Sequence, residues 1–162
     1  MAKKQTMYLE TSVISAYFDF WKSDFNQKKY TRIFWKNTLP SYTMAISEVV
    51  LAEIDLHRNA VWRSKMLALI GEFTLIKASK KVESIAKAYI AAQLFPQSEY
   101  RDALHAAYAS GSRADYLVSW NQRHITRPFK RRQIMEYNLK MGLGNPTIVS
   151  PLDFLESIST RL

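Results

Sequence analysis

The chain has 162 residues, of which 48% are hydrophobic, and its formal net charge is +9. This length is typical of one domain and the apolar content is enough for a full core, so we expect a single domain over residues 1–162. The excess of Lys and Arg favours a polyanionic partner over an acidic one. The absence of cysteine excludes disulfides and thiolate zinc sites.

A membrane surface is the competing explanation for the positive charge. No apolar run reaches the roughly 18 residues that a membrane helix needs, and no signal-peptide pattern opens the chain. We therefore expect a cytoplasmic protein that has nucleic acid as its partner and does not associate with membranes.

Short apolar runs alternate with segments of helical periodicity along the chain. In chain order, the expected elements are strand 6–9, helix 12–18, helix 30–37, strand 42–46, helix 49–54, helix 61–70, strand 73–76, helix 81–95, helix 99–110, strand 116–119, helix 128–143, strand 147–149 and a terminal helix from Pro151. Ser47 has the short hydroxyl side chain of an N-cap. The compact run 73–76 is typical of a buried strand.

This alternation predicts an α/β fold in which a parallel sheet is covered by helices on both faces. Ligands of such sheets bind outside the carboxyl ends of the strands. Glu10 and Asn121 lie directly after two of the expected strands, so we expect a functional site near them.

Three acidic residues lie at the ends of separate elements or within their first turns. Glu10 closes the first strand, Glu53 lies in the helix after the second strand, and Asp102 opens a later helix. Carboxylates that converge from three elements form the oxygen-rich kind of pocket that Mg²⁺ or Mn²⁺ prefers. The pattern indicates metal-dependent hydrolysis of a phosphodiester.

Four segments in order resemble the motifs of the PIN-domain family. They are YLETSVIS at 8–15, SEVVLAEI at 47–54, DALHAA at 102–107 and DYLVSWN at 115–121. The resemblance runs from about Tyr8 to segment 148–151. It implies a three-layer α/β/α sandwich with a central, mainly parallel sheet. It also implies an Mg²⁺- or Mn²⁺-dependent endoribonuclease similar to the toxins of type II toxin–antitoxin pairs, with RNA as substrate, an antitoxin protein as partner and a homodimeric state.

By position, Glu10, Glu53 and Asp102 match the first three acids of the family, which implies that they are catalytic metal ligands. Asn121 falls where many members carry a fourth acid. Two departures matter. Glu10 replaces the usual Asp and is one methylene longer, and Asn121 removes a negative charge, so a second metal ion would be held less strongly.

Several neighbouring polar residues are candidates for supporting roles. Thr11 and Ser12 either cap the first helix or donate to a phosphate oxygen, and we favour capping. Asp115 is interpreted first as a turn residue and otherwise as a group that orients the metal ligands. Ser119 is a further candidate for orienting the ligands.

The three histidines allow two interpretations. His57 shares a helix face with Glu53, and His105 shares one with Asp102, which resembles ligand spacing. Packing explains both more simply, with His105 as a buried donor and His57 as a residue near a helix end. His124 is a candidate for contact with a phosphate.

The positive charge is concentrated after the last predicted site segment. From Arg113 to Lys140, seven Lys or Arg residues stand against two acids. A charge run on a helix is usually a solvated face, but its position directly after Asn121 favours a surface that follows the RNA backbone. The residues that we assign to this surface are Arg123, Arg127, Lys130, Arg131 and Arg132.

A second basic stretch, from Lys22 to Lys36, contains aromatic residues. They include Phe25, Tyr30, Phe34 and Trp35, and Trp21 precedes them. Such side chains either stack on unpaired bases or form a core or dimer face. Both interpretations stay open here, and the family resemblance favours contact with a partner.

Three functions follow from these observations. The first is a metal-dependent endoribonuclease, and the second is a catalytically weakened RNA-binding domain of the same fold, which Asn121 favours. The third is a partner-binding module whose aromatic helices serve assembly.

Overall fold

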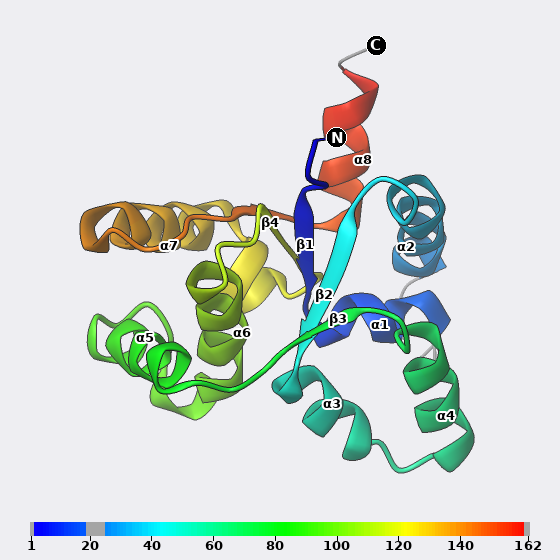
Figure 1. The fold of residues 1–162 in the computed structure, drawn as a ribbon, viewed down its shortest axis with the longest axis horizontal. Coiled ribbons are helices and arrows are strands. Elements are labelled where there is room, and N and C mark those ends of the chain that lie inside the picture. Colours follow the sequence, from blue (N-terminus) through cyan, green and yellow to red (C-terminus); the bar gives the residue numbers. More distant parts are fainter. Residues whose placement is uncertain (1, 19–24, 161–162) are drawn as a thin grey trace.

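The computed structural model describes residues 2–18 and 25–160 and has a five-stranded, all-parallel sheet at its centre (Figure 1). The strands are β1 (Thr6–Leu9), β2 (Thr43–Ser47), β3 (Thr74–Ile76), β4 (Tyr116–Val118) and β5 (Thr147–Val149). Their order is β3-β2-β1-β4-β5, so β1 is central. The predicted α/β class and the parallel sheet are confirmed.

Helices follow the strands as the periodicity predicts. They are α1 (Thr11–Phe18), α2 (Phe25–Thr38), α3 (Glu48–Asp55), α4 (Ala60–Leu69), α5 (Lys80–Ala91), α6 (Tyr100–Gly111), α7 (Pro128–Met141) and α8 (Pro151–Ser159). Two shorter helical segments were not predicted, namely η1 (Gln97–Glu99) and the π-helical turn η2 (Gln122–Thr126). Trp21 and Lys22, from the second basic stretch, lie outside the described residues.

The central strand separates two apolar layers because its side chains alternate between the faces of the sheet. Met7 and Leu9 belong to a core cluster with residues of α1, α2, α3, α4 and α8. Tyr8 belongs to a second cluster with residues of α5, α6 and α7. In Figure 1 these two groups of helices lie on opposite sides of the sheet. The three-layer α/β/α arrangement is therefore confirmed.

Two local predictions were wrong in part. The run 73–76 was expected to be a buried strand, but β3 is an edge strand and Leu75 is 41% exposed. Ser47 stands at the N-cap of α3 without a side-chain capping bond. Its hydroxyl instead lies 2.7 Å from the hydroxyl of Tyr8, because the end of β2 faces the central strand.

Two of the aromatic residues of α2 pack in the core. Phe34 is fully buried and Trp35 is nearly so, and both belong to the cluster on the Met7 face of the sheet. These two rings support the sheet and are not presented to unpaired bases.

No helix in residues 2–18 and 25–160 has the length and apolar character of a membrane span.

Gly144 joins α7 to β5 at a point of close approach, and this predicts a specific sensitivity. A Cβ at this position would lie 2.2 Å from the Ser110 carbonyl oxygen and 3.0 Å from Arg113 Cα. Both contacts are with backbone, so Gly144→Ala should lower the free energy of unfolding by about 1–3 kcal/mol. Thermal unfolding would measure this.

Gly71→Ala is the matched control because its Cβ would meet only carbonyl oxygens at 3.5 and 3.7 Å. Equal melting temperatures for the two variants would contradict the close approach at Gly144.

Candidate active site

The predicted acids lie at the carboxyl edge of the sheet, on three different elements. Glu10 follows β1, Glu53 lies in α3, and Asp102 lies in the first turn of α6. The Thr11 hydroxyl donates to Glu53 at 3.0 Å, which joins the start of α1 to α3. The charge of Glu10 affects the pKa of Asp102. The charges of all three acids raise the pKa of His105, so the fold places the three acids around this one histidine. The three do not, however, form a group whose ligand atoms all lie within 4.8 Å of one another.

Glu10 is held by three donors on one of its oxygens. Its Oε2 accepts from the Ser12 backbone N–H at 2.8 Å, from the Ser12 hydroxyl, and from the Ser119 hydroxyl at 3.1 Å. The side chain is only 5% exposed. Within the described part of the chain, Oε1 has no hydrogen bond, so this oxygen is available to a ligand.

Glu53 is held by a chain of buried hydrogen bonds that crosses four elements. Its Oε1 pairs with His105 Nε2 on α6. The other ring nitrogen of His105, Nδ1, lies 2.7 Å from the Tyr8 hydroxyl on β1, which in turn contacts Ser47. His105 is fully buried. The interpretation of His105 as a buried hydrogen-bonding residue is confirmed.

The charges on Glu53 and His105 stabilise each other. Burial by itself raises the pKa of Glu53, but the hydrogen bond and charge of His105, aided by Thr11, lower it overall. For His105, burial lowers the pKa, but the hydrogen bond that it donates to Glu53 and the charges of Glu10, Glu53 and Asp102 raise it overall. The pair therefore favours a carboxylate beside an imidazolium.

The pKa of Asp102 is shifted in the opposite direction from that of Glu53. Burial is the main reason that its pKa is raised, and the charge of Glu10 adds to the effect. The Asn121 side chain hydrogen-bonds to Asp102 and opposes the shift. Asn121 also accepts from the backbone N–H of His124 at 3.1 Å, which fixes the start of η2. Asn121 therefore occupies the predicted position beside the acids and orients one of them.

Asp102 also belongs to a group of residues suited to hold a metal ion. One ligand atom each from Glu99, Asp102 and His124 lie within 4.8 Å of one another. Of these residues, Asp102 was expected to bind metal and His124 to contact a phosphate, whereas Glu99 was not predicted to belong to the site. A signal for Glu99 was present, because it precedes Asp102 by three residues, and this spacing puts two residues on one helix face.

Other predicted residues take different places. The hydroxyls of Thr11 and Ser12 donate to Glu53 and Glu10, so the favoured capping role is not what these hydroxyls do. Ser119 donates to Glu10 and accepts from the Asn121 backbone N–H at 2.9 Å. Asp115 precedes β4 at the amino edge of the sheet, where it accepts from Thr6 N–H at 2.8 Å. The fold does not bring Asp115 to the acids.

The predicted basic residues fall into two groups. Arg123, Arg127 and Arg132 are exposed. Lys130 donates to the Leu94 carbonyl at 2.5 Å, and Arg131 pairs with Asp153 and with the Thr126 carbonyl. Burial, with the nearby Arg127 charge, lowers the pKa of Lys130. The second group has internal partners, so the side chains of the exposed group are better placed to contact a partner of the protein.

Solved structures share this fold at low sequence identity. A chain in the complex of VapBC2 from Rickettsia felis with a promoter DNA fragment has a TM-score of 0.59 and 17% identity, covering 90% of this chain and 98% of that chain. A chain in the DNA-bound VapBC of Salmonella typhimurium has a TM-score of 0.56 and 17% identity, covering 91% and 98%. No family model and no curated protein matches the sequence. The likeness confirms the expected PIN-like fold.

The raised pKa of Asp102 predicts a stabilising substitution in metal-free protein. An acid with a raised folded-state pKa lowers stability as the pH rises from its ordinary value of 3.8 through the folded value. Asp102→Asn removes the charge and keeps the shape. In chelator at neutral pH, we expect the variant to melt at a higher temperature than the wild type. The gain should shrink as the pH falls toward 3.8, and a constant difference at all pH values would contradict this account.

The Glu53–His105 pair predicts a stability window in pH. The contribution of His105 is fully present below its ordinary pKa of 6.5 and is lost as the pH rises through its raised value. The contribution of Glu53 is present above its ordinary 4.5 and is lost as the pH falls through its lowered value. Melting temperatures in chelator should therefore peak between these limits.

In His105→Gln, both sides of the melting profile should become flatter, because the charged partner is gone. Parallel profiles for the wild type and the variant would show that the pair does not control the pH dependence.

Proposed function

We propose that this chain is a metal-dependent endoribonuclease that hydrolyses RNA phosphodiester bonds. The observation that carries the proposal is the position of Glu10, Glu53 and Asp102 on three elements around His105, whose pKa all three raise, with Glu99 and His124 beside Asp102. Glu10 and Glu53 each use one oxygen in hydrogen bonds to protein groups. Within residues 2–18 and 25–160 their second oxygens have no such bond, which suits them to bind a ligand.

Mg²⁺ or Mn²⁺ is the ligand that this donor set fits. Both ions prefer carboxylate oxygens. Burial, together with the charge of Glu10, raises the pKa of Asp102, and a divalent cation would favour its ionised form. Asp102, Glu99 and His124 would hold the ion, because a ligand atom of each lies within 4.8 Å of the others, and Glu10 and Glu53 would join them, as the resemblance to the PIN-domain family implies. When bound, the ion would activate a water molecule and offset charge that develops on the phosphate.

The remaining polar residues keep the acids in place. Thr11 fixes Glu53, while Ser12 and Ser119 fix Glu10, so the carboxylates need little rearrangement when a ligand binds. Asn121 orients Asp102 without adding a fourth negative charge. His105 supplies a buried positive charge that keeps Glu53 ionised.

The RNA backbone would pass over the basic segment next to the acids. Arg123, Arg127 and Arg132 are exposed and carry charges that attract phosphates. Lys130 and Arg131 have protein partners and would shape this surface.

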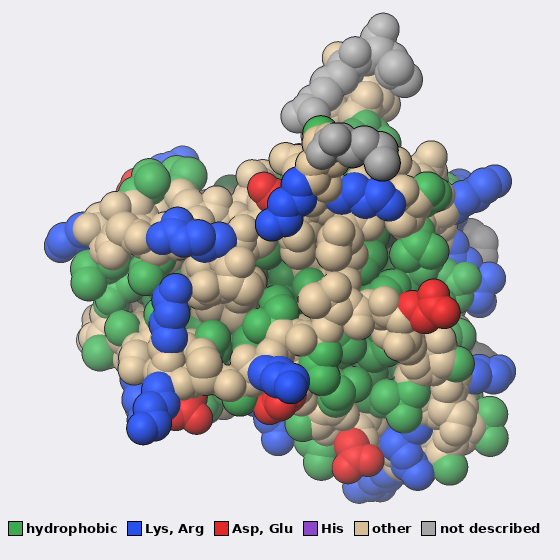
Figure 2. Space-filling model, viewed as in Figure 1, with side chains coloured by type: hydrophobic (Ala, Val, Ile, Leu, Met, Phe, Trp, Pro, Cys, Tyr) green, Lys and Arg blue, Asp and Glu red, His purple; other side chains and the backbone are tan. Residues whose placement is uncertain are grey.

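We further propose that the chain is the toxin of a cytoplasmic toxin–antitoxin pair. Support comes from the fold, which it shares with chains of two VapBC complexes. An antitoxin or a second copy of the chain would need apolar surface, and Leu67 of α4 and Leu75 of edge strand β3 are 45% and 41% exposed. Figure 2 shows apolar side chains in the middle of the face on which β3 lies, with Lys and Arg side chains around them.

A second function, RNA binding without efficient cleavage, is favoured by one observation. Asn121 provides an amide at the position where many members of the PIN-domain family, which the chain resembles, carry an acid. The negative charge available to a second metal ion is therefore smaller. Cleavage and binding must therefore be measured separately.

The proposal predicts cleavage of a structured RNA pool in Mn²⁺ or Mg²⁺ and none in chelator. Asp102→Asn should abolish cleavage, because it removes a ligand charge. Thr11→Val should reduce the rate by about 10- to 100-fold, because groups that orient metal ligands typically contribute that much. Gel-based cleavage rates measured with identically purified proteins would test both.

Thr147→Val is the matched control, since the same atoms change on an exposed residue of β5 at the amino edge of the sheet. RNA binding without cleavage in either metal would favour the second function. Cleavage that persists in chelator would refute the metal-dependent mechanism.

A further inference from the structure

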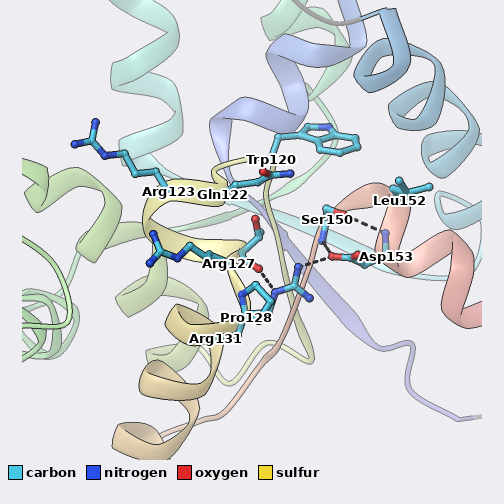
Figure 3. Close-up of a pocket in the computed structure, with 10 residues that line it drawn as sticks. Trp120, Gln122, Arg123, Arg127, Pro128, Arg131, Ser150, Leu152 and Asp153 are labelled. Carbon is cyan, nitrogen blue, oxygen red and sulfur yellow. Dashed lines mark hydrogen bonds and ion pairs between the residues drawn. The ribbon is translucent and has the colours of Figure 1, made fainter.

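A cavity lies between η2, the start of α7 and the start of α8 (Figure 3). Its volume is about 620 Å³, which is within the range of small-ligand pockets. The residues that line it are Trp120, Gln122, Arg123, Thr126, Arg127, Pro128, Arg131, Ser150, Leu152 and Asp153. None of the three proposed metal-binding acids lines this cavity, but Trp120 and Gln122 directly flank Asn121, which orients Asp102.

Trp120 provides a fixed aromatic wall. Its indole Nε1 donates to Thr31 on α2 at 2.8 Å, and its backbone N–H donates to the Ser12 hydroxyl at 2.9 Å. The side chain is only partly buried. The indole is thus fixed by a bond from its Nε1 and by a bond from the backbone of the same residue, and it still lines the cavity. Such a ring is suited to stacking on a planar group, since the side chain loses little conformational freedom when the ligand binds.

The cavity also contains polar groups that suit a base edge. Asp153 pairs with Arg131 and accepts from the Ser150 backbone N–H at 3.0 Å, both through Oδ2. Thr126 is 2% exposed, and its hydroxyl is buried without a hydrogen-bond partner in the described part of the protein. Such a hydroxyl is costly to leave unpaired, so a polar ligand group that reached it would supply a missing interaction.

Two cations stand at the rim of the cavity. Arg123 and Arg127 are exposed, and in Figure 3 their side chains extend to the same side, whereas Arg131 turns toward Asp153. Free guanidinium groups at the rim are suited to phosphates. The paired Arg131 and Asp153 inside the cavity present both donors and acceptors.

We propose that this cavity holds one unpaired nucleotide of the RNA, with its base against Trp120 and its phosphates at Arg123 and Arg127. The inference rests on the proposed ribonuclease function and adds a subsite to it. An acidic peptide is the competing occupant because the rim is basic. The nucleotide is favoured because a carboxylate-rich peptide would meet the Asp153 carboxylate, whereas amino groups of a base can donate to it.

Binding of a fluorescent single-stranded oligoribonucleotide to the full-length protein in chelator tests the proposal. Trp120→Ala should weaken binding by roughly 5- to 100-fold, because stacking on one base contributes that much. Trp120→Phe should retain most of the affinity, since it keeps an aromatic face. An oligonucleotide of the same length with abasic sites should bind Trp120→Ala and wild type equally.

The rim is tested with a matched pair of charge removals. Arg127→Gln should weaken binding of both the normal and the abasic oligonucleotide by several-fold and should reduce the salt dependence. Lys140→Gln removes one charge at the far end of α7 and should have a smaller effect. Thr126→Val tests the cavity without changing its shape or charge, and should weaken only the normal oligonucleotide.

These measurements test the nucleotide site separately from the proposed ribonuclease activity. Equal affinity of wild type, Trp120→Ala and Thr126→Val for the normal oligonucleotide would overturn the nucleotide site, as would the absence of any RNA binding. Metal-dependent cleavage, measured in parallel, stands or falls independently of that result. If the same substitutions instead weakened binding of a poly-glutamate peptide and left RNA binding unchanged, the cavity would be a site for an acidic protein segment.

Discussion

The hydrogen-bonded chain from Ser47 through Tyr8 and His105 to Glu53 is the interaction on which the site depends. It joins the end of β2, the central strand, α6 and α3, and Ser47, Tyr8 and His105 are fully buried, so water cannot replace a partner lost there. Glu53 is partly exposed; burial disfavours its carboxylate form, and the hydrogen bond and charge of His105 outweigh that effect. Because Tyr8 points to the opposite face of the sheet from Met7 and Leu9, the pleat of β1 determines where His105 can be held.

The same positive charge divides the acids into two kinds. His105 stabilises Glu53 as a carboxylate, so the pKa of Glu53 is lowered. The pKa of Asp102 is raised, because the effect of Asn121 does not outweigh that of burial. Unfavourable charge is thus concentrated at Asp102, next to Glu99 and His124. A site arranged in this way gains more from a divalent cation than a site of fully paired acids would, since the cation would favour the ionised form of Asp102 that burial and the charge of Glu10 disfavour.

Local patterns were sufficient for the parts of the structure that local forces determine. The alternation of apolar runs and helical segments predicted the parallel sheet, and the positions of the acids predicted that Glu10 and Asp102 lie near each other, but not that Glu99 lies beside Asp102. Tertiary placement decided the rest. Ser47 has the residue type of an N-cap, but its hydroxyl contacts Tyr8, 39 residues away.

Asp115 is close in sequence to Asn121, yet a parallel strand separates them, so they lie at opposite edges of the sheet. The π-helical turn η2 has no periodic signal in five residues, and it is the segment that aligns Asn121 and His124.

Two hydroxyl groups, those of Ser12 and Ser119, also connect the acids to the residues beside the cavity. The Ser12 hydroxyl donates to Glu10 and accepts from the Trp120 backbone N–H, so one small group positions both an acid and the aromatic wall. Ser119 acts in parallel, because its hydroxyl donates to Glu10 and accepts from Asn121 N–H. Trp120 and Asn121 are consecutive residues: Trp120 lines the cavity, and Asn121 acts on Asp102. A base held at Trp120 would therefore lie at a fixed distance from a phosphate at the acids. In that case, the identity of the base in the cavity, and not the attraction of the basic surface for any phosphate, would select the bond that is cut.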